Sequence, residues 1–350
     1  MNNKRKLSLL TAVSCSLVLA ACGGSGGSST VAPTPTPSPS PTPPAGPTDA
    51  QRASAATTTA QTNPNCAESA LGAFYWEIGD ANGVKVSGQV GSGTDGSTEM
   101  SIASASKWVY STYVVQKHNG VSSTDIPYLN FTSGYTQFND IACSAMATVA
   151  SCLGSQTGQE ANTIGKFSYG SGHMQNHAAS KMGLGAMTAG DLTTEIGTTL
   201  GSYGFQYGNP NLAGGLIATG SGYGGFLRAM LRGSLTMKGS LGTNKVCADP
   251  TACSSTAVAS PISSGDTGET WNYSMGHWVE DDPHVGDHAF SSAGALGFYP
   301  WIDQSKTYYG VLARRAENEQ NAGYNSAKCG RMIRQAWITG VATTASLPTP

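Results

Sequence analysis

Charged residues are scarce in this chain, and several common functional motifs are missing from it. Lysine, arginine, aspartate and glutamate make up 11% of the 350 residues. No basic run and no basic–aromatic stripe occurs beyond the first few positions, which argues against nucleic-acid binding. The sequence contains neither a Cys-x-x-Cys pair nor a His-Glu-x-x-His motif. We therefore expect no nucleic-acid partner, no metal site and no cofactor.

Apolar runs long enough to cross a bilayer are also missing. The apolar stretch 7–21 follows Lys4, Arg5 and Lys6 and is shorter than the roughly 20 residues of a membrane-spanning helix. A short apolar segment behind a basic start is typical of a secretory signal peptide. It ends in Leu-Ala-Ala-Cys22, which resembles a bacterial lipobox, whose cysteine is lipidated after cleavage. An ordinary secretory signal beside a cysteine is the alternative.

Glycine, serine and proline dominate the next part of the chain. Residues 23–48 contain Gly/Ser and then Thr-Pro and Ser-Pro repeats, a composition that forms a semi-extended tether and no core. We assign residues 1–21 to the signal peptide, 22–62 to the lipidation site and tether, and 63–345 to the folded domain. The expected location is that of an exported lipoprotein attached to the outer membrane, in the periplasm or at the cell surface. Its membrane contact would be the lipid anchor alone.

Six cysteines remain after Cys15 of the signal peptide and Cys22. An even number in an exported domain indicates disulfides, although six cysteines allow 15 pairings. Short loops favour Cys143–Cys152 and Cys247–Cys253, which leaves Cys66–Cys329 to join the two ends of the domain. Zinc binding is the alternative, and the missing Cys-x-x-Cys pair disfavours it.

Strand signals lie near both ends of the folded domain, and helix signals lie between them. The stretch 72–90 reads as two strands joined by an Asn-Gly turn, which predicts a hairpin. Further strands are expected from residue 271, over 294–303 and over 307–313. Helices are expected after Ser104, within 213–233 and over about 325–339. This order predicts an α+β fold whose sheet is assembled from distant segments.

One stretch has the residues of a nucleophilic site. Ser104 and Lys107 are three residues apart in a small-residue run that leads into an apolar segment, so a helix would place both on one face. A neighbouring amine can take the proton of a serine hydroxyl and activate it as a nucleophile. A capping serine and a solvated lysine are the structural alternative. This Ser-x-x-Lys occurs once in the chain.

The order of motifs resembles the serine β-lactamase and penicillin-binding protein superfamily, and especially its class C-like esterases, D-amino-acid peptidases and amide hydrolases. Ser104-Ala-Ser-Lys107 is similar to the first motif of that superfamily, and Tyr169-Gly-Ser171 is similar to its second motif. Ala213-Gly-Gly-Leu216 resembles a structural segment of the branch. The resemblance spans about residues 70 to 340. It implies an antiparallel sheet flanked by helices, together with a mostly helical lobe.

The resemblance also implies a role for each matching residue. Ser104 would attack a carbonyl carbon, while Lys107 and Tyr169 would act as acid and base. The backbone N–H groups of Ser104 and Ala295 would form an oxyanion hole, and Ser171 would bind substrate.

The third motif departs from the pattern of the superfamily. An ungapped register places Ser292-Ala-Gly294 where the superfamily has a lysine or histidine triad, so its usual cation is missing. A looser register would use His288, and His284 could also reach the site from the same loop. We count Ser292, Gly294 and His288 as candidate substrate-binding residues. Because the missing cation usually meets a substrate carboxylate, its absence favours an esterase or non-peptide amide hydrolase acting on a small or oligomeric substrate. A D-Ala-type peptidase, a β-lactamase and a catalytically silent binding relative are the alternatives.

Overall fold

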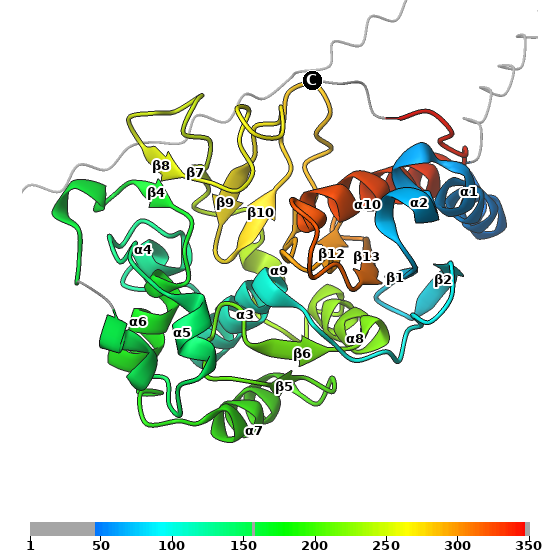
Figure 1. Cartoon of the computed structure of the whole chain (residues 1–350). Coiled ribbons are helices and arrows are strands. Elements are labelled where there is room, and N and C mark those ends of the chain that lie inside the picture. The colour runs from blue at the N-terminus through cyan, green and yellow to red at the C-terminus, as the bar shows by residue number, and fades with distance from the viewer. Residues whose placement is uncertain (1–45, 156–157, 347–350) are drawn as a thin grey trace, which may run out of the picture. The chain divides into compact units, whose positions relative to one another are not determined.

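A computed structural model describes residues 46–155 and 158–346, so the predicted signal peptide, Cys22 and most of the predicted tether lie outside the described residues. Its largest sheet has the strand order β2-β1-β13-β12-β11-β10-β9-β7 (Figure 1). Every strand pair in this sheet is antiparallel. The strands of this sheet are β1 (Phe74–Asp80), β2 (Val84–Val90), β7 (Val246–Cys247), β9 (Asn272–Ser274), β10 (His277–Val279), β11 (Phe290–Ser291), β12 (Tyr299–Ile302) and β13 (Tyr308–Arg314).

The predicted α+β class is confirmed, and the first and last strands of the chain pair with each other near one edge of this sheet. Phe74 of β1 lies opposite Arg314 of β13, and the expected hairpin joins β1 to β2. One expected strand begins later than predicted. Residues 294–298 form a turn closed by a hydrogen bond from the Gly297 N–H to the Gly294 carbonyl, and β12 begins at Tyr299.

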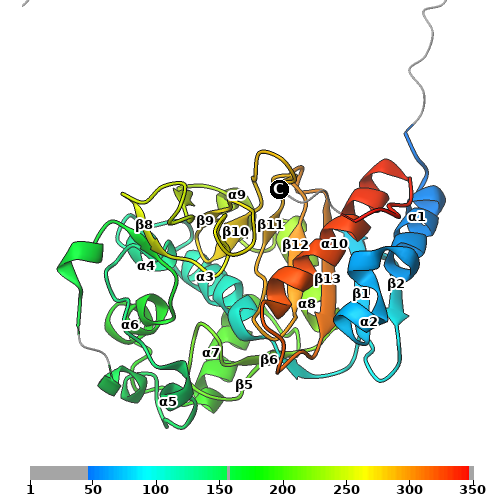
Figure 2. The same cartoon turned by 45° about the horizontal axis from the view of Figure 1, so that its top comes forward.

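Helices cover both faces of the sheet. Figure 2 shows α10 in front of β12 and β13 and α8 behind them. No described helix is long and apolar enough to cross a membrane. The helices are α1 (Asp49–Thr62), α2 (Glu68–Leu71), α3 (Ser106–Lys117), α4 (Ile126–Leu129), α5 (Asp140–Ser144), α6 (Gly172–Ser180), α7 (Ala189–Leu200), α8 (Gly220–Leu231), α9 (Met237–Ser240) and α10 (Ala322–Thr339).

Helix α1 belongs to the folded domain, although the sequence assigned it to the tether. Thr48 caps it through a capping box with Gln51, which satisfies N–H groups that a helix start leaves free. Its buried face consists largely of alanines and packs against α10. Arg52 of α1 donates hydrogen bonds to the carbonyls of Trp337 and Ile338 at the end of α10, at 2.8 and 2.7 Å. The domain therefore begins before residue 49. The sequence did not predict this helix, because it consists mainly of alanine and threonine and has no large apolar residues.

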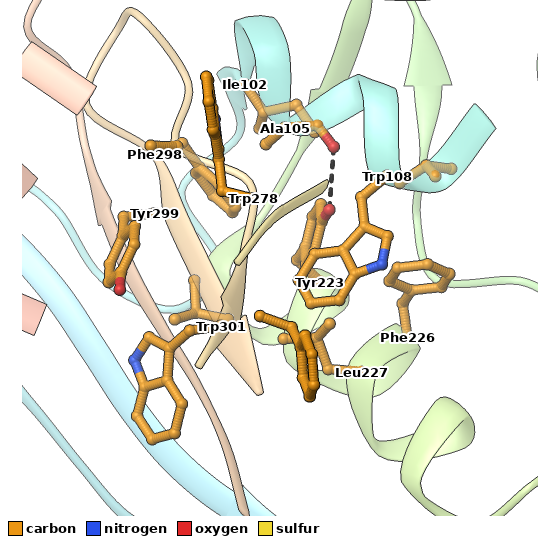
Figure 3. Close-up of a cluster of buried hydrophobic side chains, with 14 of the residues drawn as sticks. Ile102, Ala105, Trp108, Tyr223, Phe226, Leu227, Trp278, Phe298, Tyr299 and Trp301 are labelled. Carbon is orange, nitrogen blue, oxygen red and sulfur yellow. Dashed lines mark hydrogen bonds between the residues drawn. The ribbon is translucent and has the colours of Figure 1, made fainter. Parts of the chain in front are cut away.

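Helix α3 runs through the interior between the large sheet and the remaining helices. All its residues from Ser106 to Val115 are buried. Large aromatic side chains pack around its first turns, and Figure 3 shows them converging from α3, α8 and the sheet. Among them, Tyr223 donates a hydrogen bond from its hydroxyl to the Ala105 carbonyl at 2.9 Å. The first turns of α3 are thus held by aromatic packing and by this hydrogen bond.

Two small sheets complete this part of the fold. The first has the order β3-β6-β5, and in the second β4 pairs with β8. Their strands are β3 (Met100–Ser101), β4 (Phe167–Ser168), β5 (Gln206–Tyr207), β6 (Leu216–Ala218) and β8 (Ala257–Ala259). The glycine-rich segment predicted as a turn before α8 therefore contains β6. Strand β6 pairs with β3, which ends three residues before Ser104.

Three disulfides link the cysteines in the pairs expected from the sequence. They are Cys66–Cys329, Cys143–Cys152 and Cys247–Cys253. The first connects the segment after α1 to α10 across 263 residues of chain. Closing so long a loop lowers the entropy of the unfolded chain most. This disulfide therefore stabilises the joining of the two chain ends.

Candidate active site

Ser104 lies in a tight turn just before α3. The turn is a 3-10 helix, Ala103–Ala105, and α3 itself begins at Ser106. Ala103 has a φ of 45°, a left-handed conformation that is costly for a residue with a Cβ atom. The Ser106 hydroxyl donates to the Ala103 carbonyl at 2.6 Å and accepts from the Leu216 N–H at 3.2 Å. The serine turn is thus fastened to β6 while the Ser104 side chain stays half-exposed.

Lys107 is buried directly beside Ser104. Its Nζ lies 2.9 Å from the Ser104 Oγ and 2.9 Å from the Ala213 carbonyl oxygen, and both accept hydrogen bonds from it. The Lys107 side chain is 3% exposed. Burial lowers the pKa of Lys107 to about 8, although Asp140 opposes part of this effect. An amine with such a pKa is partly neutral near pH 8 and can accept a proton.

Tyr169 follows β4, and three aromatic rings hold its side chain. Its ring stacks on Trp278 at 5.2 Å between centroids and meets the edges or faces of Phe131 and Tyr273. The Lys107 Nζ lies 5.0 Å from the centre of the same ring. Burial raises the pKa of Tyr169 well above its usual value, and a hydrogen bond with Ser104 opposes part of the rise. The phenol is therefore protonated at neutral pH.

The remaining residues of the first two motifs meet around the same point. Ser171 is buried at the start of α6 and lines a cavity together with Ser104, Lys107 and Tyr169. The residue before Tyr169 is fixed by His173, whose Nε2 lies 2.9 Å from the Ser168 carbonyl oxygen. The first two motifs that the sequence predicted therefore lie together around one cavity.

The segment predicted as the third motif lies on the other side of Ser104. Ser292 is buried directly after β11, and its hydroxyl donates to the Ser104 carbonyl at 3.1 Å. A Cβ atom on Gly294 would stand 2.2 Å from the Ile102 carbonyl oxygen, so a larger residue would displace the serine turn. Ala295 lines the cavities beside Ser104. Ser292 thus contacts the backbone of the nucleophile turn.

Two cavities meet at Ser104, Tyr169 and Ala295. The small cavity, of about 210 Å³, lies between Trp278, Ile262 and Tyr324. The large cavity, of about 630 Å³, extends past Ser171, Asp140, Asn209 and Asn211. A bond placed over Ser104 would therefore have space on both sides for the two parts of a substrate.

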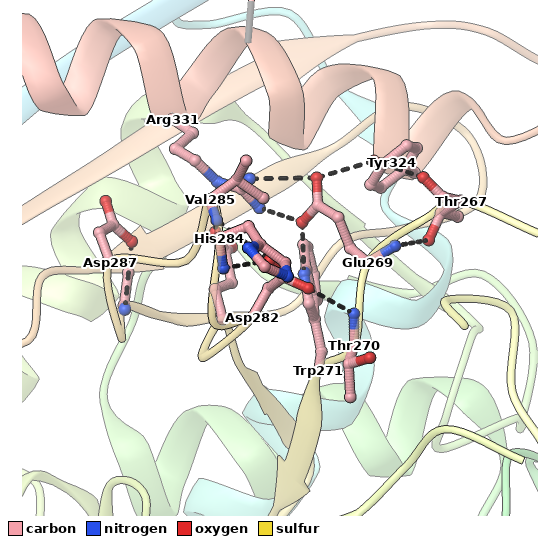
Figure 4. Close-up of polar contacts among 12 residues, drawn as sticks. Thr267, Glu269, Thr270, Trp271, Asp282, His284, Val285, Asp287, Tyr324 and Arg331 are labelled. Atoms are coloured by element: carbon pink, nitrogen blue, oxygen red, sulfur yellow. Dashed lines mark hydrogen bonds and ion pairs between the residues drawn. The ribbon is translucent and has the colours of Figure 1, made fainter. Parts of the chain in front are cut away.

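A buried polar network holds Tyr324, which lines the small cavity (Figure 4). Glu269 accepts hydrogen bonds from the Tyr324 hydroxyl at 2.7 Å and from the Arg331 guanidinium at 2.8 and 3.1 Å. The Trp271 indole N–H donates to the same carboxylate at 2.7 Å. Because every partner is buried or half-buried, this network fixes the position of Tyr324 at the cavity.

The two histidines considered for the third motif lie outside both cavities. His288 is exposed, with a φ of 58°, and its N–H donates to the Glu280 carbonyl. His284 is exposed as well, and its N–H donates to Asp282 at 2.8 Å (Figure 4). Among the described residues lining the two cavities, Lys107 is the one cation. The described part of the chain also holds no cluster of three histidine, cysteine or acidic side chains suited to a metal ion.

Sequence reasoning missed the residues that shape the large cavity. Asp140 stands at the start of α5, 36 residues after Ser104, and Asn211 precedes the segment that accepts from Lys107. The Asn211 Nδ2 donates to the Asp140 Oδ1 at 2.7 Å. No motif spacing links these two positions. Their proximity depends on how α5 packs, and the neighbouring Cys143 was the one local signal.

No protein-family model matches the sequence, and no curated protein matches it either. Solved structures do match the fold. EstCE1, a hydrolase with promiscuous acyltransferase activity, is 10% identical with a TM-score of 0.57, and the match covers 83% of this chain and 99% of that one. A β-lactamase from Mycobacterium bovis is 16% identical with a TM-score of 0.52, covering 77% and 96%. A D-stereospecific amidohydrolase from Streptomyces sp. is 13% identical with a TM-score of 0.51, covering 81% and 99%. This chain therefore has the β-lactamase/transpeptidase fold.

Proposed function

We propose that this protein is an exported serine hydrolase that cleaves an ester or amide through an acyl-enzyme intermediate on Ser104. One observation carries the proposal. The amine of a fully enclosed lysine, whose pKa burial lowers to about 8, lies 2.9 Å from the hydroxyl of a serine that faces two cavities. A structural lysine would normally keep its charge in solvent or pair it with a carboxylate. Lys107 instead binds a hydroxyl and a backbone carbonyl.

The reaction would proceed in two acyl-transfer steps. The Ser104 Oγ attacks the substrate carbonyl carbon while neutral Lys107 takes the hydroxyl proton. The carbonyl oxygen becomes an oxyanion that accepts from the N–H groups of Ser104 and Ala295. As the carbon–heteroatom bond breaks, the leaving group takes a proton from Tyr169, which Lys107 then reprotonates. Water then attacks the acyl carbon and loses a proton to the same pair. The pair returns this proton to the Ser104 Oγ as the ester bond breaks, which releases the acid and free Ser104.

Lys107 rather than Tyr169 is assigned as the first base because of their opposite pKa shifts. Burial favours the neutral form of each group, which is the amine for lysine and the phenol for tyrosine. A neutral amine accepts a proton and a neutral phenol donates one. The two groups therefore have complementary roles at mildly alkaline pH.

The lining of the cavities favours ester or non-peptide amide substrates over β-lactams and D-Ala-D-Ala peptides. The last two carry a carboxylate. Among the described lining residues, Lys107 is the one cation, and Ser104 and Ala213 already occupy it. Ser292 has no charge, and its hydroxyl is directed to the backbone of Ser104. A substrate carboxylate would therefore lose water without gaining a partner.

The test is a substrate panel given to the protein from residue 46 onward. Short-chain p-nitrophenyl esters, a chromogenic cephalosporin and a D-Ala-D-Ala peptide are compared, together with labelling by a fluorophosphonate probe. We expect ester turnover and labelling, both abolished by Ser104→Ala. Faster cephalosporin or peptide cleavage would favour the alternative enzymes. Absence of both turnover and labelling would identify a silent binding relative.

The proposed location outside the cytoplasm rests on separate observations. The three disulfides are typical of an oxidising compartment, and the Leu-Ala-Ala-Cys22 segment resembles a lipobox. We infer that Cys22 carries the lipid anchor. Expression of the full chain with radiolabelled palmitate should label the wild type, whereas Cys22→Ser should be unlabelled and released from the membrane fraction. Labelling of Cys22→Ser would reject this anchor site.

A further inference from the structure

The large cavity contains a carboxylate to which the proposed chemistry assigns no role. Asp140 lines this cavity at the start of α5, and its side chain reaches solvent. Among the residues that the structure describes, no lysine, arginine or histidine forms an ion pair with it. Its described side-chain hydrogen bond is the one from the Asn211 Nδ2 to Oδ1, at 2.7 Å. An unpaired carboxylate that faces a cavity beside a nucleophile is available to a ligand.

The position of this carboxylate is set by buried neighbours. Asn211 is 4% exposed, and its own Oδ1 accepts from the Ala213 N–H at 3.0 Å. The Ala213 carbonyl in turn accepts from Lys107. On the other side, the Cys143–Cys152 disulfide ties down α5, and the Asn139 side chain caps it. Asp140 is thus held at a defined distance from Ser104 through Asn211, Ala213 and Lys107.

Among the described residues, no cation forms an ion pair with the Asp140 carboxylate at its end of the large cavity. Lys107 lies beneath Ser104, enclosed and occupied by two acceptors. The acid of the small cavity, Glu319, is neutralised by Arg314, whose Nη2 lies 3.0 Å from its Oε1. Around Asp140 the lining is polar but uncharged, with Asn209, Asn211 and Ser171. A positive group bound there would gain the carboxylate. Lys107 lines the same cavity, but it is buried, already hydrogen-bonded to Ser104 and Ala213, and partly neutral because burial lowers its pKa to about 8.

We propose that Asp140 is a specificity-determining residue, and that the large cavity binds a positively charged amine on the substrate. This proposal rests on the proposed function and narrows its substrate class. The preferred ester or amide would carry an ammonium group on the part that occupies the large cavity. The neutral residues Asn209 and Ser171 offer oxygen acceptors to the same group. An anionic substrate would be repelled at this end, and the described lining of the small cavity offers it no free cation.

The test compares substrates of equal shape and different charge, using the mature full-length protein in detergent. One series carries trimethylammonium, the isosteric tert-butyl group or a carboxylate on the acyl chain of an aryl ester. A second series carries the same groups on the alcohol. We expect kcat/KM to be roughly tenfold higher for the cationic member than for the neutral one in at least one series. Added salt should reduce this ratio, because Asp140 is solvent-accessible.

The variant that isolates the charge is Asp140→Asn. Its amide oxygen can still accept from Asn211, so the local hydrogen bond can persist. The cationic-to-neutral ratio should fall to about one. The midpoint of the pH profile should also fall, because Asp140 raises the pKa of Lys107. Glu317→Gln removes one charge from an exposed residue outside both cavities, and it should leave the ratio as in the wild type.

The outcomes separate this proposal from the proposed function. Neutral ester turnover that depends on Ser104, without cationic preference in either series, would reject the role of Asp140 and keep the hydrolase. Where turnover is absent, calorimetric binding of the cationic and neutral compounds to Ser104→Ala decides. Equal binding there overturns the proposal, and tighter cation binding supports it. If Asp140→Asn fails to fold, the salt dependence of the wild-type ratio gives the answer, and a ratio insensitive to salt counts against Asp140.

Discussion

The ring of Tyr169 stacks on that of Trp278, with 5.2 Å between the centroids and 12° between the ring planes. Trp278 is 1% exposed and belongs to β10 of the large sheet. The phenol is therefore oriented by a strand on one side, while Phe131 and Tyr273 enclose its other sides. Because stacking rather than the hydroxyl holds this ring, the hydroxyl can be removed without moving the ring.

Replacement of Tyr169 by phenylalanine should lower kcat/KM for an ester by about 100-fold or more, which is typical for loss of a positioned proton donor. Thermal stability should change little, since the stack on Trp278 persists. Tyr273→Phe is the matched control. The Tyr273 hydroxyl is buried without a described partner, so its removal should leave kcat/KM within about threefold. Equal losses in both variants would show that the effect is packing and not proton transfer.

The pH dependence of hydrolysis should report the ionisation of Lys107. Its pKa lies near 8 because burial disfavours the ammonium form, and the ammonium form cannot accept the serine proton. Activity should therefore rise with pH to a midpoint near 8 and level off above it. The measurement is kcat/KM for a neutral ester between pH 5.5 and 10. A profile that is flat across this range would remove Lys107 as the base.

The same pH profile measured on Lys107→Arg tests whether Lys107 is the ionising group. Arginine stays protonated throughout this range, so the rising limb should disappear and the rate should fall at least 100-fold. The control is Gln116 on the same helix, which is partly exposed and lies outside both cavities. Gln116→Glu should keep the wild-type midpoint. A surviving limb near pH 8 in Lys107→Arg would assign the ionisation to another group.

The burial of Lys107 should also lower the free energy of unfolding wherever the lysine is protonated. Its folded pKa is lower than the 10.5 of an exposed lysine, so the unfolded chain binds more protons between pH 8 and 10.5. Stability should therefore increase with pH in this window. The free energy of unfolding of Lys107→Met should exceed that of the wild type by about 2 kcal/mol at pH 7. This difference should shrink towards pH 10. The Ala213 carbonyl loses its donor, which limits the gain.

Urea unfolding at pH 7 and pH 10 measures this difference, with Lys181→Met as the control because Lys181 is exposed. The control should show no comparable gain at either pH. A Lys107→Met variant that is less stable than the wild type at pH 7 would mean that the two hydrogen bonds of the lysine outweigh the burial of its charge.

Helix α1 should be required for stability even though it resembles tether. A chain beginning at residue 46 should unfold like the full domain. A chain beginning at residue 63 should lose several kcal/mol, because it exposes the face of α10 that packs on α1 and removes the Arg52 hydrogen bonds to the last turn of α10. Both chains keep the Cys66–Cys329 disulfide, so that bond is controlled. Equal urea midpoints for the two chains would show that α1 does not contribute to the stability of the domain.

Hydrophobic and turn patterns allowed much of the fold to be predicted. The Asn-Gly turn and the apolar runs around it predicted the hairpin of β1 and β2, and the closing helix was expected near its observed place. Helix α1 could not be predicted, because its alanine-rich buried face is too weakly apolar to show a helical period. Strand β6 was concealed in a similar way by flanking glycines.

The sequence by itself determined the Ser104–Lys107 pair, because three residues at the start of a helix bring two side chains together through local geometry alone. It also determined that Ser292 stands where the family resemblance expects a cation. The tertiary structure alone decided that Lys107 is buried, which lowers its pKa, and that it forms no ion pair with any carboxylate in the described part of the chain. It alone placed Trp278 on Tyr169, and Asp140 with Asn211 in the large cavity. These relationships join segments 36 to 174 residues away from Ser104. Such contacts depend on how distant elements pack together, so they cannot be predicted from local periodicity in the sequence.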